Sequence, residues 1–393
     1  MTAPTHAINW SPTHQARALL LMLTEGGDAD VWQRINHEGD IAIVDEVLTG
    51  RTKNRFFEKL RQRLPLPTRQ LDELIADQVI TAESTGSRLI IPGDTQWPTQ
   101  LNDLAERAPL GLWVAGTADL RLLALRSVAI VGARAATTYG LMLARNTAAT
   151  LADHGWLVVS GGAFGIDAAA HQGALDAGGS TACVLAGGID VTYPRAHESL
   201  FRAIAGQGVL ISETALGVSA QRQRFLTRNR IISALTRSTV VVEAALRSGS
   251  RTTAREAEEL FRLVMAYPGP VTSSASAGCH ELIKSRLAVL VSDAEDVLSL
   301  LGETEAAPEQ MQLSIPAETD AETDVETANI ETTDSEKAVF NQMRERKTAT
   351  AEGLARDTGF PLDDVVAALG LLELAGLITR NQNRWRFRAR HRS

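Results

Sequence analysis

A glycine-rich segment, SGGAFGIDAAAHQGAL at Ser160–Leu175, has the residue pattern best suited to holding an anion. The apolar run at 156–159 predicts a strand before it, and a helix is expected to start at Asp167 with that residue as its N-cap. Glycines permit positive φ angles and close approach of a ligand, and a helix N-terminus presents free N–H groups. The segment predicts a phosphate site, and a tight turn without a ligand is the alternative. The residues expected to bind phosphate are Ser160, Gly161, Gly162 and Gly165.

Three further loops are expected at the same edge of a sheet. Val131–Arg134 combines a glycine with an arginine, Leu185–Asp190 is glycine-rich, and Glu243–Thr253 places small residues at a helix start between two arginines. Because the carboxyl ends of parallel strands share one edge, the four loops together predict a long anionic ligand rather than a mononucleotide. The contacts expected from these loops are Arg134, Arg247, Ser248, Gly249 and Ser250.

The segment RQRFLTRNRIISAL at 222–235 repeats arginine at short intervals with one aromatic residue between. Arginine pairs with phosphate through two hydrogen bonds and stacks on bases, and an aromatic ring supplies a stacking face. A helix start with solvated arginines and a core phenylalanine fits the spacing equally well. The nucleic-acid contacts expected here are Phe225, Arg228, Asn229 and Arg230.

Signals for catalysis are weak. The sequence has no GxxxxGK(S/T) motif, no GxGxxG after the first parallel strand, no HExxH and no paired CxxC. His171 lies four residues after Asp167, and Glu213 and Glu243 follow predicted strands, so each of these residues is a conceivable acid–base group. Structural hydrogen bonds are the favoured interpretation of all of them. We therefore expect no catalytic residue, no metal and no cofactor.

The order of elements predicts an α/β fold. From residue 127 onward, near-continuous Val/Ile/Leu runs alternate with helical patterns, which is typical of a Rossmann-like parallel sheet covered on both faces. Four short helical patterns precede residue 86, at 14–23, 41–48, 55–64 and 71–76. The expected domains are a small helical N-terminal domain (1–85), an extended Rossmann-like domain (86–302), an acidic linker (303–335) and a winged-helix domain (336–393).

The net charge of −8 conceals opposite charges in the C-terminal quarter. Residues 303–336 contain eleven acids and no Lys or Arg, whereas residues 337–393 contain eleven Lys or Arg and six acids. The acidic segment has too few apolar residues to bury a core and predicts a flexible linker. The basic segment predicts helices at 336–346, 351–357 and 362–375, the last ended by Gly376, and strands at 377–380 and 384–388. This is the winged-helix pattern, which serves DNA binding or protein contacts.

Two features bear on the cellular compartment. Cys183 and Cys279 are too far apart to indicate a disulfide framework or a metal site. The apolar run Leu19–Leu23 is too short for a signal peptide or a membrane span. We therefore expect a cytoplasmic protein without membrane contact.

Several motifs together resemble the DprA/Smf family of DNA-processing proteins. They are VAIVGAR at 128–134, the segment at 160–175, GGIDVTYP at 187–194, GVLISE at 208–213, FLTRNRIISAL at 225–235, VVVEAALRSGSRTTA at 240–254 and AYPG at 266–269. The chain departs from the usual family pattern at His197, where Asn is common, at Leu226, where Pro is usual, and around His280.

This resemblance implies a sequence-independent single-stranded DNA-binding protein rather than an enzyme. Family members protect incoming strands and load the RecA recombinase during natural transformation, as homodimers formed through the Rossmann-like domain. The resemblance also implies that Arg134, the loop at 160–165, Phe225–Arg230 and Arg247–Ser250 line a DNA groove.

Two other functions remain open from the sequence. One is a Rossmann-like nucleotide-processing enzyme of the nucleoside monophosphate hydrolase type, although Pro270 interrupts the expected PGGxGTxxE motif. The other is a regulator that binds double-stranded DNA through the winged helix.

Overall fold

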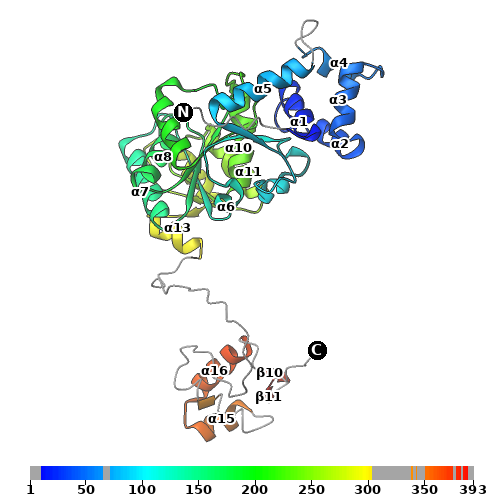
Figure 1. The fold of residues 1–393 in the computed structure, drawn as a ribbon. Coiled ribbons are helices and arrows are strands. Elements are labelled where there is room, and N and C mark those ends of the chain that lie inside the picture. The colour runs from blue at the N-terminus through cyan, green and yellow to red at the C-terminus, as the bar shows by residue number, and fades with distance from the viewer. Residues whose placement is uncertain are drawn as a thin grey trace, which may run out of the picture. The chain divides into compact units, whose positions relative to one another are not determined.

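The computed structural model describes residues 10–64, 71–302, 338–339, 342, 350–374, 378–381 and 384–387. The chain divides into two compact units, Met1–Glu309 and Gln310–Ser393. Figure 1 shows both, coloured along the chain. The predicted linker at 303–335 and most of the predicted helix at 336–346 lie outside the described residues.

A mixed sheet forms the centre of the first unit. Its strands are β1 (Ser87–Ile90), β2 (Leu112–Ala115), β3 (Ser127–Val131), β4 (Leu157–Ser160), β5 (Thr181–Leu185), β6 (Val209–Ser212), β7 (Ser238–Val241), β8 (Leu263–Ala266) and β9 (Val289–Leu290). In the described part of the chain these nine strands lie in the order β1-β2-β6-β5-β4-β3-β7-β8-β9. The strands from β3 onward are parallel, and β2 is antiparallel to both β1 and β6. The predicted Rossmann-like parallel core is confirmed.

Helices cover both faces of this sheet. They are α6 (Leu120–Ala124), α7 (Thr138–Asp153), α8 (Ile166–Asp176), α9 (Glu198–Gln207), α10 (Arg222–Leu235), α11 (Gly249–Glu259), α12 (Ala277–Lys284) and α13 (Ala294–Leu300), with a 3-10 segment η1 (Thr99–Arg107). Side chains alternate across a strand, so Val128 and Ile130 of β3 pack in the core with α7 and α8. Ala129 and Val131 pack in the opposite core, with α10 and α11. A strand buried on both faces explains the unbroken apolar runs in the sequence.

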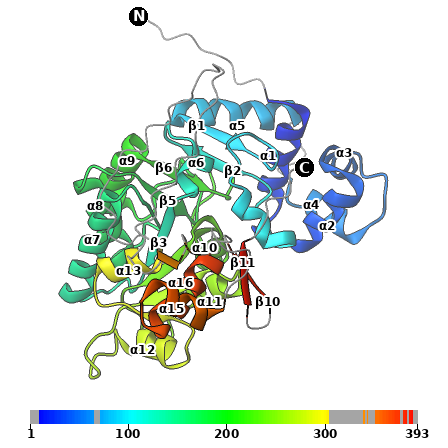
Figure 2. The ribbon, with the colours of Figure 1, turned by 90° about the horizontal axis from the view of Figure 1, so that it is seen from below.

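The N-terminal helices pack on the antiparallel edge of the sheet. They are α1 (Pro12–Leu23), α2 (Ala29–Glu38), α3 (Asp40–Thr49), α4 (Arg55–Arg61) and α5 (Leu71–Thr85). Leu19 and Leu20 of α1 share one apolar core with Leu89 and Trp113 of β1 and β2. The ring centroids of Trp10 and Trp113 lie 5.7 Å apart. The five helices fall in the predicted small helical N-terminal domain (1–85), and they lie with the sheet in one compact unit, as Figure 2 also shows.

The second unit contains α15 (Ala351–Thr358), α16 (Leu362–Leu374) and the antiparallel pair β10 (Ile378–Asn381) and β11 (Arg384–Phe387). Val339, Leu354, Val365, Leu369 and Trp385 form its apolar core. These elements match the predicted winged helix. The predicted stop at Gly376 and the turn between the strands lie outside the described residues.

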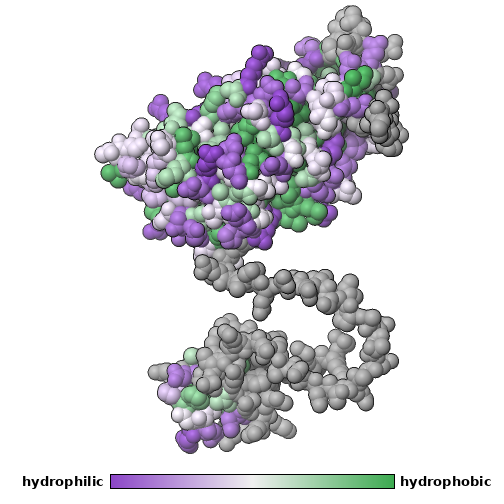
Figure 3. All heavy atoms as spheres, turned by 60° about the vertical axis from the view of Figure 1, so that its left-hand side comes forward, coloured by the Kyte–Doolittle hydropathy of each residue, from purple (hydrophilic) through white to green (hydrophobic). Residues whose placement is uncertain are grey.

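The surface mixes polar and apolar side chains. Figure 3 shows one face of the molecule, on which hydrophobic residues are scattered among hydrophilic ones. Within the described ranges, no helix is both long and apolar enough to cross a lipid bilayer.

Candidate nucleic-acid interface

The strand order creates a crevice beside β3. The chain builds the sheet outward from β3 through β4, β5 and β6, and then returns to place β7 on the other side of β3. In open α/β sheets such a reversal separates the loops at the carboxyl edge and leaves room for a ligand. A groove of about 800 Å³ lies there, between the β3–α7 loop, helix α10 and the β7–α11 loop.

The groove is rich in arginine. Among the residues that line it, Asp167 is the one acid. The six arginines that line it are Arg134, Arg222, Arg228, Arg247, Arg251 and Arg255. A concave surface with this excess of positive charge attracts anions and raises their local concentration.

Aromatic rings lie among these cations. The guanidinium carbon of Arg134 lies 4.7 Å from the ring centroid of Phe225, which is a cation–π distance. The ring of Tyr193 meets Phe225 edge-on, with centroids 5.7 Å apart, and Tyr193 is 53% exposed. The groove therefore presents flat apolar surfaces beside positive charge.

Hydrogen bonds hold the β7–α11 loop in place. Asn229 Nδ2 donates to the carbonyl oxygen of Gly249 at 3.3 Å, so α10 supports the start of α11. The hydroxyl groups of Ser248 and Ser250 are 2.8 Å apart, and Arg251 donates to the carbonyl oxygen of Leu246. The predicted residues Arg134, Phe225, Arg228, Asn229, Arg247, Ser248, Gly249 and Ser250 are all brought together along the groove.

Arg228 is the buried member of this group. Its guanidinium donates to the carbonyl oxygen of Val184 in β5, and burial lowers its pKa, although Asp167 acts in the opposite direction. A Cβ at Gly161 would collide with the same guanidinium. Arg228 thus supplies positive charge from beneath the groove.

Of the glycine-rich loop, Ala163 lines the groove, whereas the four residues expected to bind phosphate do not. Ser160 is fully buried, and its hydroxyl donates to the carbonyl oxygen of Ile130 at 2.6 Å. Gly161 packs against Arg228. Gly162 has φ 68°, and a Cβ there would lie 2.6 Å from the sulfur of Cys183. Gly165 has φ 79° and packs against the backbone of the β3–α7 loop. These small residues are required by close packing, and Ser160, Gly161, Gly162 and Gly165 are not among the residues that line the groove.

Asp167 explains why this loop does not offer an open anion site. Helix α8 begins at Ile166 with Gly165 as its N-cap, so the prediction of Asp167 as the cap is wrong. The Asp167 carboxylate instead accepts a hydrogen bond from the backbone N–H of Ala163 at 3.3 Å. Burial raises the pKa of Asp167, and hydrogen bonds from the loop and the charge of Arg228 oppose that shift. The loop therefore binds a carboxylate of its own chain.

Arg230 is also absent from the groove. Its side chain is 1% exposed and pairs with Glu213 at 2.6 Å. A Cβ at Gly27 would lie 3.0 Å from Arg230 Nε, so the α1–α2 loop closes over the pair. The structure thus places Arg230, predicted as a phosphate contact, away from the groove, where its buried charge needs Glu213 as partner.

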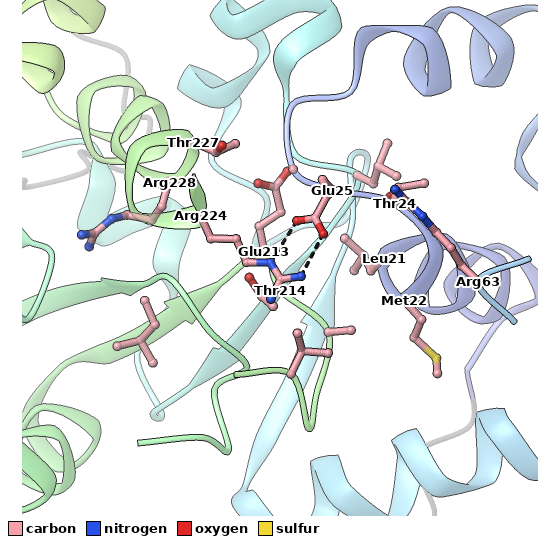
Figure 4. Close-up of a pocket in the computed structure, with 15 residues that line it drawn as sticks. Leu21, Met22, Thr24, Glu25, Arg63, Glu213, Thr214, Arg224, Thr227 and Arg228 are labelled. Carbon is pink, nitrogen blue, oxygen red and sulfur yellow. Dashed lines mark hydrogen bonds and ion pairs between the residues drawn. The ribbon is translucent and has the colours of Figure 1, made fainter. Parts of the chain in front are cut away.

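A small pocket lies between the α1–α2 loop and α10. It has a volume of about 220 Å³, and Arg224 crosses it to bond both oxygens of Glu25 at 2.9 and 2.8 Å. Figure 4 shows this ion pair, with Glu213 beside it. The ion pair joins α10 to the N-terminal helices.

The conceivable acid–base residues have structural partners. Glu243 accepts hydrogen bonds from the backbone N–H and the hydroxyl of Thr137, at 2.9 and 2.6 Å, at the start of α7. His171 Nδ1 lies 2.7 Å from Thr181 Oγ1, and burial lowers the pKa of this histidine to about 3. Glu213 is held by Arg230, so each of these residues has a hydrogen-bond or ion-pair partner within the chain. Across the described ranges, no three His, Cys, Asp or Glu side chains converge in an arrangement that could hold a metal ion.

The groove is also lined by Tyr193, Arg222, Arg251 and Arg255, which were not among the contacts expected from the sequence. Arg251 and Arg255 could have been predicted to act together, because residues four apart share one face of a helix. Nothing in the sequence around Tyr193 indicates a place in the groove, since that place depends on how the β5–α9 loop folds.

The fold and the groove define a Rossmann-like protein with a basic crevice at the topological switch point and a separate winged-helix unit. The chain belongs to the DprA/Smf family: residues 88–302 match the family model of DNA recombination-mediator protein A, and residues 323–382 match the DprA winged helix domain. A Mycobacterium tuberculosis relative, named after DNA processing protein DprA, is 40% identical over 95% of this chain and 94% of its own length.

Two comparisons with Streptococcus pneumoniae agree. Its DNA processing protein DprA is 39% identical over 52% of this chain and 71% of that protein. The X-ray structure of DprA from this organism superposes with a TM-score of 0.61 at 29% identity, covering 74% of this chain and 98% of that one.

Proposed function

We propose that this protein binds single-stranded DNA in the arginine-rich groove without regard to base sequence. The groove carries the proposal, because it brings arginines together with the half-buried ring of Phe225 and the exposed ring of Tyr193. Arginines bind backbone phosphates, and bases free of a complementary strand stack on aromatic rings. Every base has a π-face, so such binding tolerates any sequence. The family to which the chain belongs supports DNA as the ligand.

We further propose that the protein protects the bound strand and loads RecA recombinase onto it, as a cytoplasmic homodimer formed through the Rossmann-like unit. The family of DNA recombination mediators supports this role. The winged-helix unit would add a contact to double-stranded DNA.

Binding rather than catalysis fits the chemistry of the site. The carboxylates at this edge of the sheet are engaged: Asp167 by its own loop, Glu213 by Arg230 and Glu243 by Thr137. A nucleotide hydrolase requires an acid or base that reaches its substrate. Incubation with a panel of nucleotides, followed by mass spectrometry, tests this: release of free base would favour the enzyme.

The function is tested by fluorescence anisotropy with labelled single-stranded and double-stranded DNA of about 20 nucleotides, over a salt series. We expect preference for the single strand, weakening with salt through counterion release, and severe loss in Arg134→Glu. Deleting residues 303–393 distinguishes a winged-helix regulator, which would lose all binding. Duplex binding that Arg134→Glu leaves intact would refute the groove as the site.

A further inference from the structure

A second pair of aromatic rings lies at the same edge of the sheet, outside the residues that line the groove. The ring centroids of Phe164 and His197 are 4.6 Å apart, with an interplanar angle of 66°. Phe164 is 49% exposed although it belongs to a loop whose neighbouring residues are mostly buried. None of the contacts described above requires this phenyl ring to face solvent.

The imidazole of this pair is fixed in one orientation. His197 Nδ1 lies 3.0 Å from the carbonyl oxygen of Gly162, which can only accept, so Nδ1 carries the proton and donates. The buried ring of Phe201 packs behind it, with centroids 6.0 Å apart and planes at 87°. The pair is therefore a rigid surface that needs little ordering when a ligand binds.

Chain connectivity places this surface next to the groove. Ala163 and Tyr193 both line the groove; Phe164 directly follows the first, and His197 follows the second by four residues. The backbone N–H of Ile166 donates to Ala133 at 3.2 Å, so the loop that carries Phe164 is bonded to the loop that carries Arg134.

We propose that Phe164 and His197 form a second stacking platform, on which bases of a single strand continue beyond the Phe225–Tyr193 pair. The proposal rests on the proposed function, since it extends the same strand along the sheet edge. The ligand group is a nucleobase, whose flat face matches the exposed phenyl ring. Arg195 is exposed between Tyr193 and His197 and supplies positive charge for the phosphate between the two platforms.

The test uses the full chain and labelled oligothymidylate. Phe164→Ala is expected to weaken binding about 5- to 150-fold, the effect of losing one base stack, and Phe164→Trp is expected to restore it. His197→Asn keeps a donor for Gly162 and removes the ring, so it is expected to give a smaller loss. The matched control is Phe261→Ala, because Phe261 is 98% exposed in the α11–β8 loop, at the opposite edge of the sheet. Thermal unfolding midpoints check that all variants are folded.

Strands with single abasic sites, scanned along the sequence, identify the contact itself. An abasic nucleotide keeps the phosphate and removes the base. At the position whose base stacks on Phe164, it should therefore weaken wild-type binding as much as Phe164→Ala does. The variant should be insensitive to an abasic site at that position. Equal binding by Phe164→Ala and wild type with every strand, while Arg134→Glu binds weakly, would overturn the second platform alone. Absence of any single-strand binding by wild type would overturn both proposals.

Discussion

Replacing Arg134 by alanine removes both a cation and the partner of an aromatic ring. Arg134 is exposed at the groove, and its guanidinium lies 4.7 Å from the centroid of Phe225. A hydrogen bond from a charged group contributes about 1.5–3 kcal/mol, and an exposed cation–π contact about 0.5–1 kcal/mol. The cation–π contact is already made in the free protein, so the lost phosphate bond sets the effect. We expect Arg134→Ala to weaken single-strand binding by about 1.5–3 kcal/mol, or roughly 10- to 150-fold.

The salt dependence of DNA binding gives a second quantity that tests the same assignment. If the groove arginines other than the buried Arg228 each neutralise one phosphate, the slope of log K against log salt concentration is about −3.5 for single-stranded DNA. Removing one of them should change the slope to about −2.8. Fluorescence anisotropy from low to moderate salt measures both quantities on one set of samples.

The control is Arg121→Ala. Arg121 is also an exposed arginine, but it lies on α6, which precedes β3 at the opposite edge of the sheet. Its replacement should leave affinity and slope unchanged. If Arg134→Ala binds like wild type with an unchanged slope, or if both variants lose affinity equally, the assignment of phosphates to the groove is refuted.

Two further predictions concern buried ionisable side chains. Arg230→Ala should lower the free energy of unfolding by about 3–5 kcal/mol in urea titrations, because it leaves Glu213 buried without its partner; unchanged stability with weakened DNA binding would contradict this. Burial lowers the pKa of His171 in the folded protein to about 3, whereas an exposed histidine has a pKa of about 6.5. As the pH falls, the imidazole is therefore protonated first in the unfolded chain, near pH 6.5. Wild type should therefore lose about 2 kcal/mol from this group between pH 7 and pH 5. His171→Gln should not show that loss of stability. Urea titrations of both proteins at about pH 7 and about pH 5 measure it, and an identical pH dependence of wild type and His171→Gln would refute the reasoning.

The parallel core could be predicted because its sequence signal is local. Strands such as β3 are buried on both faces, so each appears as a run of apolar residues between helical patterns. The docking of the N-terminal helices could not be predicted, since it depends on contacts such as Trp10 with Trp113, which are a hundred residues apart. Helix α2 was missed because its sequence, ADVWQRINHE, is largely polar and buries only Val31 and Ile35.

The site could be predicted where a residue follows a strand directly. Arg134 and the Arg247–Ser250 segment lie in loops at the carboxyl edge, and topology alone brings them together. Arg222 and Arg230 belong to the same helix and have the same side chain, but one is exposed and the other is buried against Glu213 from β6. The partner that decides between them is distant in sequence, so spacing within the helix could not separate the two.

The glycine-rich loop shows why sequence alone confuses packing with ligand binding. Gly162 is needed because a Cβ would meet Cys183, yet the same residue type marks loops that approach a phosphate. In this chain the carboxylate of Asp167 bonds the N–H of Ala163, in the loop where a mononucleotide phosphate would be held. The positive charge is instead distributed along an open groove, on arginines from α10, the β3–α7 loop and α11. A mononucleotide requires one fixed anion cradle, whereas a strand requires repeated charges along a line, so this distribution favours a polymer as the ligand.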